Sequence, residues 1–196
     1  MPPTVVIPPG GTWFDTLKRS FDDVPIDDAN DNLISTTEFL EAAEALTTLF
    51  GNDLLGNVKK IRDRQLAAPA DSETLQALVT NELKSGKPVA SGGLVWLVRG
   101  LDFTAQSLRQ NLSAPSEELS ASFRAAYSCT LKEHHNFMVK PLFSAAMSAT
   151  PYRKDFYARL GEDQAKIQAA MEKEVAALEK VVAILKEFLK RMDVKG

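Results

Sequence analysis

The stretch Asp53-Leu-Leu-Gly-Asn57-Val-Lys-Lys60 combines three kinds of polar side chain at helical spacing. On a helix, steps of four and three residues place Asp53, Asn57 and Lys60 in one row, while the apolar residues between them point elsewhere. The carboxylate accepts hydrogen bonds, the ammonium donates them and the amide does both, so the row can bind a polyhydroxylated group such as a sugar. The same spacing also fits a solvated helix face with one weak ion pair.

Other chemistries find little support in the sequence. His134 and His135 are adjacent, so on a helix they would face about 100° apart, and no Glu-x-x-His or His-x-x-x-His spacing occurs. The single cysteine, Cys129, lacks the surroundings of a nucleophile, and no nucleophile elbow is present. We therefore expect no metal, no cofactor and no enzymatic activity.

Composition and charge are those of an ordinary globular protein. The 196 residues are 44% hydrophobic and 25% charged, which suits one domain with a sizeable core. The net charge of −3 argues against nucleic acid as a partner. No apolar run is long enough to span a bilayer, and residues 1–11 do not resemble a secretory signal. We expect a flexible arm over residues 1–11, a single domain over residues 12–196 and a cytoplasmic location.

Apolar residues recur at intervals of three and four along nearly the whole chain, which predicts helices. Thr12 is the expected N-cap of the first helix, and Ser35 with Glu38 has capping-box spacing. No alternating strand pattern, phosphate loop or internal repeat is visible, so we expect an all-α fold of about eight helices. The expected segments are 12–21, 35–50, 53–65, 71–84, 89–112, 116–139 with a continuation over 142–149 after a break at Pro141, 152–160 and 162–192.

Three separated motifs occur in one order along the chain. The first is the polar row that begins at Asp53, and the second is Leu94-Val-Trp96-Leu-Val-Arg99-Gly-Leu101. The third is Tyr127-Ser-Cys-Thr-Leu-Lys-Glu-His-His135-Asn-Phe137, followed by Ala-Ala-Met-Ser-Ala-Thr-Pro151-Tyr-Arg-Lys-Asp155-Phe156. Together they resemble the glycolipid transfer protein family in order and in spacing, over nearly the whole chain.

The resemblance implies a two-layer, all-α sandwich in which lipid chains enter between the layers and the headgroup stays at the surface. By resemblance, Trp96 would stack against a sugar ring, and Asp53 and Asn57, with Lys60 beside them, would bind its hydroxyl groups. Asp53 would also accept a hydrogen bond from the ceramide N–H, while His135 would donate one to the ceramide carbonyl. The implied activity is transfer of neutral glycosylceramides between membranes without any bond being made or broken.

An acidic protein of this kind would touch bilayers only transiently, through a local basic and aromatic patch. The expected membrane-contact residues are Phe137, Lys140, Tyr152, Arg153 and Lys154. Phe137 stands where some relatives have tryptophan, and residues 193–196 lack the aromatic ending of the animal proteins, so the tail receives no binding role. We expect a monomer, and pairing on lipid loading stays open.

Two alternatives remain at the level of the sequence. The ceramide-1-phosphate branch of the superfamily would need more cations, although Lys60 and Arg99 leave this possibility open. A helical sensor or interaction protein would carry no lipid between membranes. The sugar assignment is preferred because Asn57 and Trp96 stand where the phosphate branch has basic residues.

Overall fold

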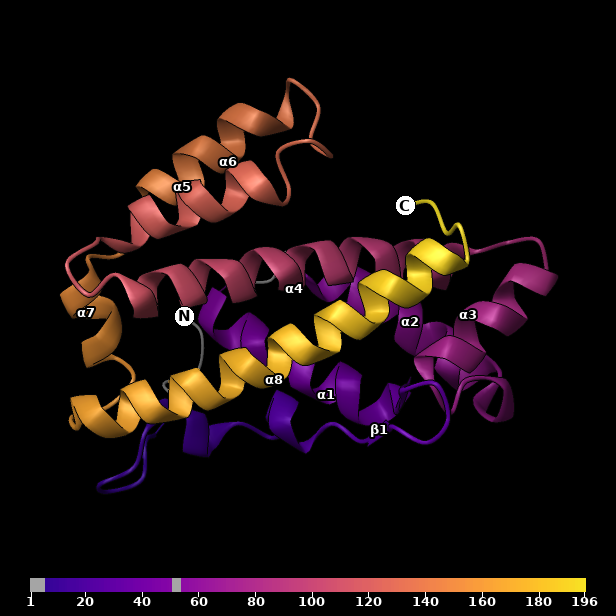
Figure 1. Ribbon diagram of the computed structural model, residues 1–196, viewed down its shortest axis with the longest axis horizontal. Helices are drawn as coiled ribbons and strands as arrows, with labels where there is room; N and C mark the ends of the chain where they lie inside the picture. Colours follow the sequence, from indigo (N-terminus) through magenta and orange to yellow (C-terminus); the bar gives the residue numbers. More distant parts are fainter. Residues whose placement is uncertain (1–5, 51–53) are drawn as a thin grey trace. The chain divides into compact units, whose positions relative to one another are not determined.

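A computed structural model describes residues 6–50 and 54–196, and eight α-helices dominate this part of the chain (Figure 1). The prediction of an all-α protein with about eight helices is confirmed. In the described ranges, no helix is both long and apolar enough to cross a bilayer. The helices are α1 (Thr36–Phe50), α2 (Leu55–Ala67), α3 (Leu75–Lys84), α4 (Val89–Ser113), α5 (Leu119–Cys129), α6 (Val139–Ser148), α7 (Arg153–Ala158) and α8 (Gln164–Arg191).

The chain gathers into two compact units whose segments alternate along the sequence. The first unit contains Leu17–Val98 and Ala177–Gly196, and the second contains Arg99–Ala176 with the segment that ends at Thr16. Helices α4 and α8 contribute residues to both units. The assignment of residues 12–196 to a single domain stays a prediction.

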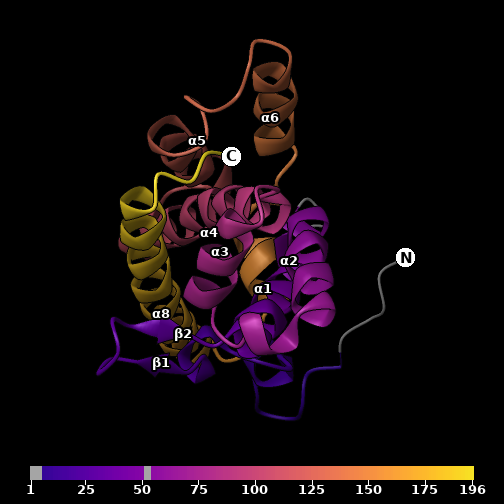
Figure 2. The same ribbon diagram turned by 90° about the vertical axis from the view of Figure 1, so that its right-hand side faces the viewer.

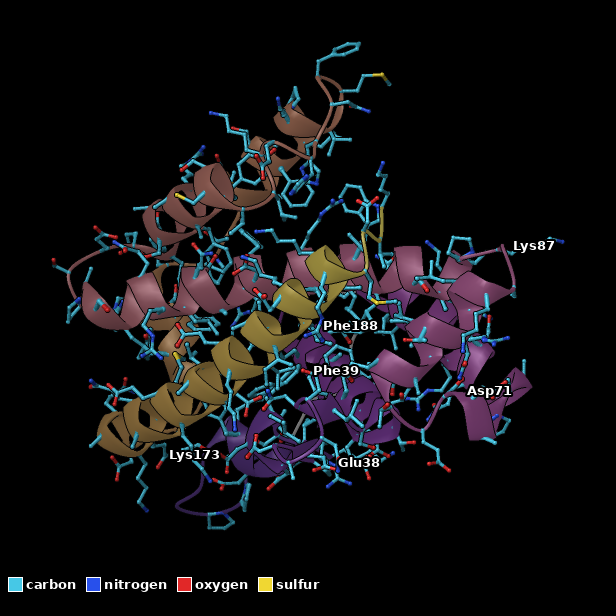
Figure 3. All side chains as sticks on the ribbon, turned by 45° about the vertical axis from the view of Figure 1, so that its right-hand side comes forward. Glu38, Phe39, Asp71, Lys87, Lys173 and Phe188 are labelled. Atoms are coloured by element: carbon cyan, nitrogen blue, oxygen red, sulfur yellow. The ribbon has the colours of Figure 1, made fainter. Side chains whose placement is uncertain are left out.

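The core of the first unit follows the apolar periodicity of its helices. Phe39 on α1 and Phe188 on α8 are 0% and 6% exposed and point into the helix packing, whereas Glu38 and Asp71 lie at the periphery (Figure 3). Each helix therefore buries one stripe of side chains, as the sequence pattern predicts. Further fully buried members of this core are Leu40, Leu46, Ile61, Leu75, Leu78, Leu94 and Leu97.

A short antiparallel ribbon in the first unit is an element that the sequence analysis did not expect. Strands β1 (Ile26–Asp27) and β2 (Leu33–Ile34) pair Ile26 with Ile34, and Figure 2 shows the ribbon beside α8. In the turn, Asp31 adopts a positive φ of 55° and its carboxylate pairs with Arg191 on α8. Two residues per strand are too few to produce an alternating pattern, which is why the sequence did not reveal the ribbon.

The segment before α1 also differs from the prediction. Instead of one helix over residues 12–21, it forms two 3₁₀ turns, η1 (Trp13–Thr16) and η2 (Phe21–Asp23). Thr12 is not a side-chain cap, because its backbone N–H and hydroxyl both donate to the carboxylate of Asp15, at 2.6 and 3.0 Å. These hydrogen bonds lower the pKa of Asp15.

The predicted long helix over residues 116–139 is also wrong, because it is divided by a loop. Helix α5 ends at Cys129, and α6 begins at Val139, where the side-chain oxygen of Asn136 accepts from the backbone N–H groups of Met138 and Val139 at 2.9 and 3.1 Å. Pro141 lies in the first turn of α6, where a backbone N–H has no helical partner, so it does not break the helix.

A buried carboxylate fixes the start of α4. Glu82 on α3 is 4% exposed and accepts from the backbone N–H groups of Ala90 and Ser91, at 2.9 and 2.6 Å, and from the Ser91 hydroxyl at 2.6 Å. It satisfies N–H groups that the first turn of a helix leaves without partners. The Glu82 carboxylate therefore sets both the residue at which α4 begins and the position of α4 against α3.

We expect Glu82→Ala to lower the free energy of unfolding by about 2–3 kcal/mol, because it leaves buried donors unsatisfied. Urea denaturation followed by circular dichroism measures this change. Glu73→Ala, which removes an exposed carboxylate just before α3, is the matched control and should change stability by less than about 0.5 kcal/mol. Equal effects of the two substitutions would contradict the capping role of Glu82.

Candidate functional site

Helices α2 and α4 approach each other closely at Gly93, in the first unit. A Cβ atom at this position would lie 3.2 Å from Cδ and 3.3 Å from Cβ of Lys60, and 3.5 Å from the backbone oxygen of Asn57. Trp96 follows one turn later on the same face of α4. The absent side chain of Gly93 thus lets Asn57 and Lys60 on α2 lie beside the face of α4 that carries the indole.

Two members of the predicted row contact each other. The Lys60 ammonium donates to the side-chain oxygen of Asn57 at 3.0 Å, and Lys60 is exposed while Asn57 and Trp96 are partly buried. Asp53 lies outside the described residues. The structure therefore pairs an amide with an ammonium on α2, at the point where α2 approaches Gly93, one helical turn before the indole of Trp96 on α4. Groups of these three kinds can bind a sugar ring.

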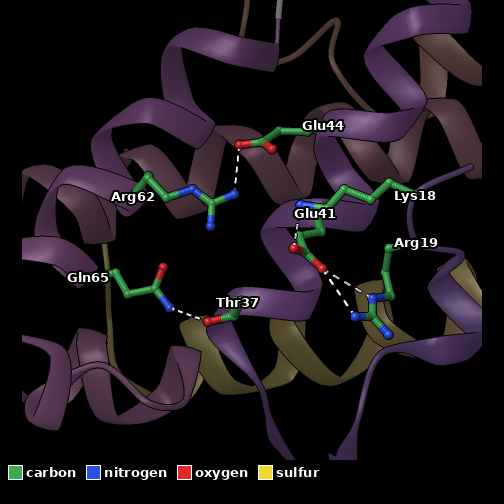
Figure 4. Close-up of polar contacts among 7 residues, drawn as sticks. All are labelled: Lys18, Arg19, Thr37, Glu41, Glu44, Arg62 and Gln65. Carbon is green, nitrogen blue, oxygen red and sulfur yellow. Dashed lines mark hydrogen bonds and ion pairs between the residues drawn. The ribbon is translucent and has the colours of Figure 1, made fainter.

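Polar contacts between α1 and α2 hold the row in place (Figure 4). Arg62 donates to the Glu44 carboxylate at 2.8 Å, and Gln65 donates to the Thr37 hydroxyl at 2.7 Å. These side chains occupy the part of α2 that faces α1. The first of these contacts, at Arg62, lies only two residues after Lys60. The contacts therefore fix the rotation of α2 about its axis and, with it, the direction in which Asn57 and Lys60 point.

The C-terminal tail also contacts this region, which the sequence did not reveal. A Cβ atom on Gly196 would lie 2.7 Å from Cγ1 of Val95 and 3.2 Å from Cδ1 of Trp96. Only a glycine fits this close approach without displacing its neighbours. The tail therefore packs against one edge of the indole, although its residue types alone gave no sign of such a contact.

His135 lies in the second unit, in the loop between α5 and α6. Its Nδ1 atom is 3.2 Å from the hydroxyl of Tyr127, and its ring centroid is 4.4 Å from that of Phe143. Burial lowers the pKa of the His135 imidazole, and the charges of His134 and Lys140 act in the same direction. The imidazole is therefore neutral around pH 7 and supplies one N–H donor.

The membrane-contact residues predicted from the sequence fall into two groups within the second unit. Phe137 and Lys140 are exposed at the N-terminal end of α6, whereas Tyr152, Arg153 and Lys154 follow its C-terminal end. A ten-residue helix spans about 15 Å, so the two groups lie at opposite ends of α6. Their joint role in membrane contact stays a prediction.

The first group gains two apolar members that the sequence analysis missed. Phe137, Met138 and Leu142 are 81%, 65% and 69% exposed, and Lys140 lies among them. The signal in the sequence was the apolar run from Phe137 to Val139, which lacks the polar alternation of a half-buried helix. Such a cluster of exposed apolar side chains is typical of a surface that contacts another protein or a membrane.

In the second group, the side chain of Arg153 is directed into the protein. Its guanidinium donates to the backbone oxygen of Asn111 at 2.8 Å, to the side chain of Asn111 and to the hydroxyl of Tyr157 at 3.3 Å. Asn111 is fully buried, so Arg153 ties α7 to the C-terminal part of α4. Tyr152 and Lys154 stay exposed.

Comparisons with known proteins define the class to which this fold and these residues belong. The family model described as glycolipid transfer protein matches residues 34–162. A glycolipid transfer protein of Aureobasidium melanogenum is 59% identical, over 96% of this chain and 98% of that protein. The fungal glycolipid transfer protein HET-C2 has a similar structure with a TM-score of 0.89 and 55% identity, covering 91% of this chain and 97% of that one.

A third relative, the glycolipid transfer fold of FAPP2, which selects simple glycosphingolipids, has a TM-score of 0.83 and 27% identity, over 94% of this chain and 98% of that one. The architecture is thus the all-α fold of glycolipid transfer proteins. The chain belongs to the glycolipid transfer protein family. The resemblance that the three motifs predicted is confirmed.

The close approach at Gly93 can be tested by comparing it with the neighbouring glycine. Gly92→Ala should raise the free energy of unfolding by about 0.5–1 kcal/mol, since a Cβ there meets only the Lys195 oxygen at 3.7 Å. Gly93→Ala should be at least about 1 kcal/mol less stable than Gly92→Ala, because its methyl group presses on Lys60. Urea denaturation measures both. Equal gains in stability would show that α2 does not depend on Gly93.

Proposed function

We propose that the protein carries glycosphingolipids, specifically neutral glycosylceramides, between membranes. The observation that carries this proposal is the gathering of Asn57 and Lys60 on α2 beside the face of α4 that presents Trp96. Membership of the glycolipid transfer protein family supports it, as does the 59% identity to a glycolipid transfer protein. The proposal assigns no catalytic step to the protein.

Each headgroup residue receives a role that fits its chemistry. The flat indole of Trp96 supports the apolar face of a sugar ring. Asn57 can donate to one hydroxyl and accept from another, Lys60 donates, and Asp53 accepts. Such a set discriminates against lipids without sugar hydroxyls, because those lipids would leave its polar groups without partners.

The ceramide amide adds a second element of recognition. It offers one N–H donor and one carbonyl acceptor, and the family resemblance assigns them to the Asp53 carboxylate and the His135 imidazole. The neutral state of His135 suits this role, since a neutral imidazole with a proton on Nε2 donates to a carbonyl without carrying a charge into the site.

Transfer follows from the cost of exposing hydrocarbon to water. Each methylene group of a lipid chain that leaves the bilayer costs about 0.8 kcal/mol, so the spontaneous exit of a two-chain lipid is slow. A protein that shields the chains in an apolar tunnel lowers this barrier. It can therefore speed exchange between membranes while leaving the lipid chemically unchanged.

A sugar suits this site better than a phosphate does. A phosphate headgroup requires several cations that converge on its oxygens. On α2, the Lys60 ammonium already donates to Asn57, and the aromatic surface of Trp96 contributes no charge. A liposome assay that compares galactosylceramide with ceramide phosphate tests this preference directly.

We expect Trp96→Ala and Asp53→Val each to abolish galactosylceramide transfer between vesicles while leaving the helical content nearly unchanged. Lys60→Ala should reduce transfer, and Lys59→Ala is its matched control because Lys59 is exposed and paired with Asp63 at 2.6 Å. Labelled lipid in donor vesicles reports the rates. Full transfer by Trp96→Ala or Asp53→Val would refute the headgroup assignment.

We further propose that the protein is cytoplasmic and docks on membranes through the N-terminal end of α6. Three exposed apolar side chains there, on Phe137, Met138 and Leu142, can enter the interface of a bilayer, and Lys140 can meet anionic lipid. Phenylalanine lacks the indole N–H that favours the headgroup region, so the contact is weak and readily reversed.

Phe137→Ser should weaken partitioning onto phosphatidylcholine vesicles about three- to tenfold, because it removes a large apolar side chain from the contact surface. Leu66→Ser on α2 is the control, since Leu66 is similarly exposed, at 72%, but lies in the other unit. Vesicle sedimentation measures bound protein. If Leu66→Ser and Phe137→Ser behave alike, α6 is not the docking element.

A further inference from the structure

Two aromatic rings hold the His135 side chain in one orientation. Tyr127 on α5 stacks on Phe143 of α6, with ring centroids 5.5 Å apart and an interplanar angle of 13°. The imidazole contacts both rings, at 4.4 Å from Phe143 and 5.7 Å from Tyr127. Helices α5 and α6 flank the loop that carries His135. They therefore fix the orientation of the imidazole ring and place its Nδ1 atom beside the Tyr127 hydroxyl.

The hydrogen bond between the Tyr127 hydroxyl and Nδ1 has one favourable direction. Tyr127 is only 6% exposed, and within the described ranges its hydroxyl makes no hydrogen bond other than this one. If Nδ1 carried the proton and donated, the phenolic hydrogen of this largely buried side chain would have no acceptor among the described residues. If the phenol donates, both groups are satisfied and the imidazole proton must be on Nε2.

The Tyr127 phenol and the His135 imidazole are both neutral, so one proton lies between the phenolic oxygen and Nδ1. Burial raises the pKa of Tyr127 and lowers that of His135. An ionised phenolate or a protonated imidazole would reverse or remove the bond, but burial disfavours both charged forms. The direction from the hydroxyl to Nδ1 therefore holds at neutral pH.

We propose that Tyr127 is a positioning residue that fixes the Nε2–H tautomer of His135 and thereby determines that this imidazole recognises a hydrogen-bond acceptor. The identity of that acceptor, the ceramide carbonyl, rests on the proposed function. In the opposite tautomer, Nε2 would present a lone pair to the carbonyl oxygen, and two acceptors repel each other. Tyr127 thus contributes to specificity without touching the lipid.

Tyr127→Phe tests the proposal, because it keeps the ring that stacks on Phe143 and removes only the hydroxyl. Long-range ¹H–¹⁵N correlation spectra of the lipid-free protein report which nitrogen of His135 is protonated. In the unmodified protein we expect a protonated Nε2 and a bare Nδ1. In Tyr127→Phe the two nitrogen shifts should move toward each other, and galactosylceramide transfer should fall about three- to tenfold.

A second background separates tautomer control from a general structural role. The side-chain amide of His135→Gln places a donor near the position of Nε2 but has no tautomers. In that background, Tyr127→Phe should change transfer by less than about twofold. Tyr157→Phe is the matched control, since it removes another buried tyrosine hydroxyl of the same unit, one that bonds Asn111, and it should leave the His135 spectrum unchanged.

The outcomes distinguish this inference from the proposed function. A protonated Nδ1 in the unmodified protein would overturn the inference, and so would unchanged nitrogen shifts in Tyr127→Phe, whatever the transfer rates are. An equal loss of transfer from Tyr127→Phe in the histidine and glutamine backgrounds would also overturn it. Absence of galactosylceramide transfer by the unmodified protein would instead refute the proposed function, while the spectra would still decide the tautomer.

Discussion

The approach of α2 to α4 at Gly93 is the constraint on which the candidate headgroup residues depend. Any side chain there would meet Lys60 and the Asn57 backbone within van der Waals distance, so the helices pack closely only because this position has no Cβ. The ion pair and hydrogen bond between α1 and α2 then fix the rotation of α2, and Glu82 fixes the start of α4. Three separate interactions thus position one small polar surface on rigid helices.

The second unit uses a different device to position His135, which lies on a loop. The side chain of Asn136, its neighbour, accepts hydrogen bonds from two backbone N–H groups at the start of α6, so the loop ends at a fixed place, and the aromatic rings of Tyr127 and Phe143 orient the imidazole. The apolar surroundings also keep the imidazole neutral.

The sequence predicted the elements with strong apolar periodicity, such as α1, α4 and α8, because each buries one continuous stripe. It failed over residues 116–139, where the loop between α5 and α6 is itself rich in apolar and helix-compatible residues. The sequence also proposed Asn57, Lys60 and Trp96, but it could not show that α2 lies beside α4. That contact depends on Gly93, and nothing in the sequence distinguishes Gly93 from Gly92. The exposure of Met138 and Leu142 depends likewise on where α6 begins.

These features favour recognition by the direction of hydrogen bonds over recognition by charge. The Lys60 ammonium is engaged by an amide, the imidazole is kept neutral by burial, and the aromatic surface of Trp96 has no formal charge. On the proposed function, groups with so little net charge would gain little from an anionic headgroup. They would gain most from a neutral headgroup whose donors and acceptors alternate. On the proposed function, each misplaced hydrogen would cost a bond, and control of the imidazole proton by Tyr127 would contribute to the specificity.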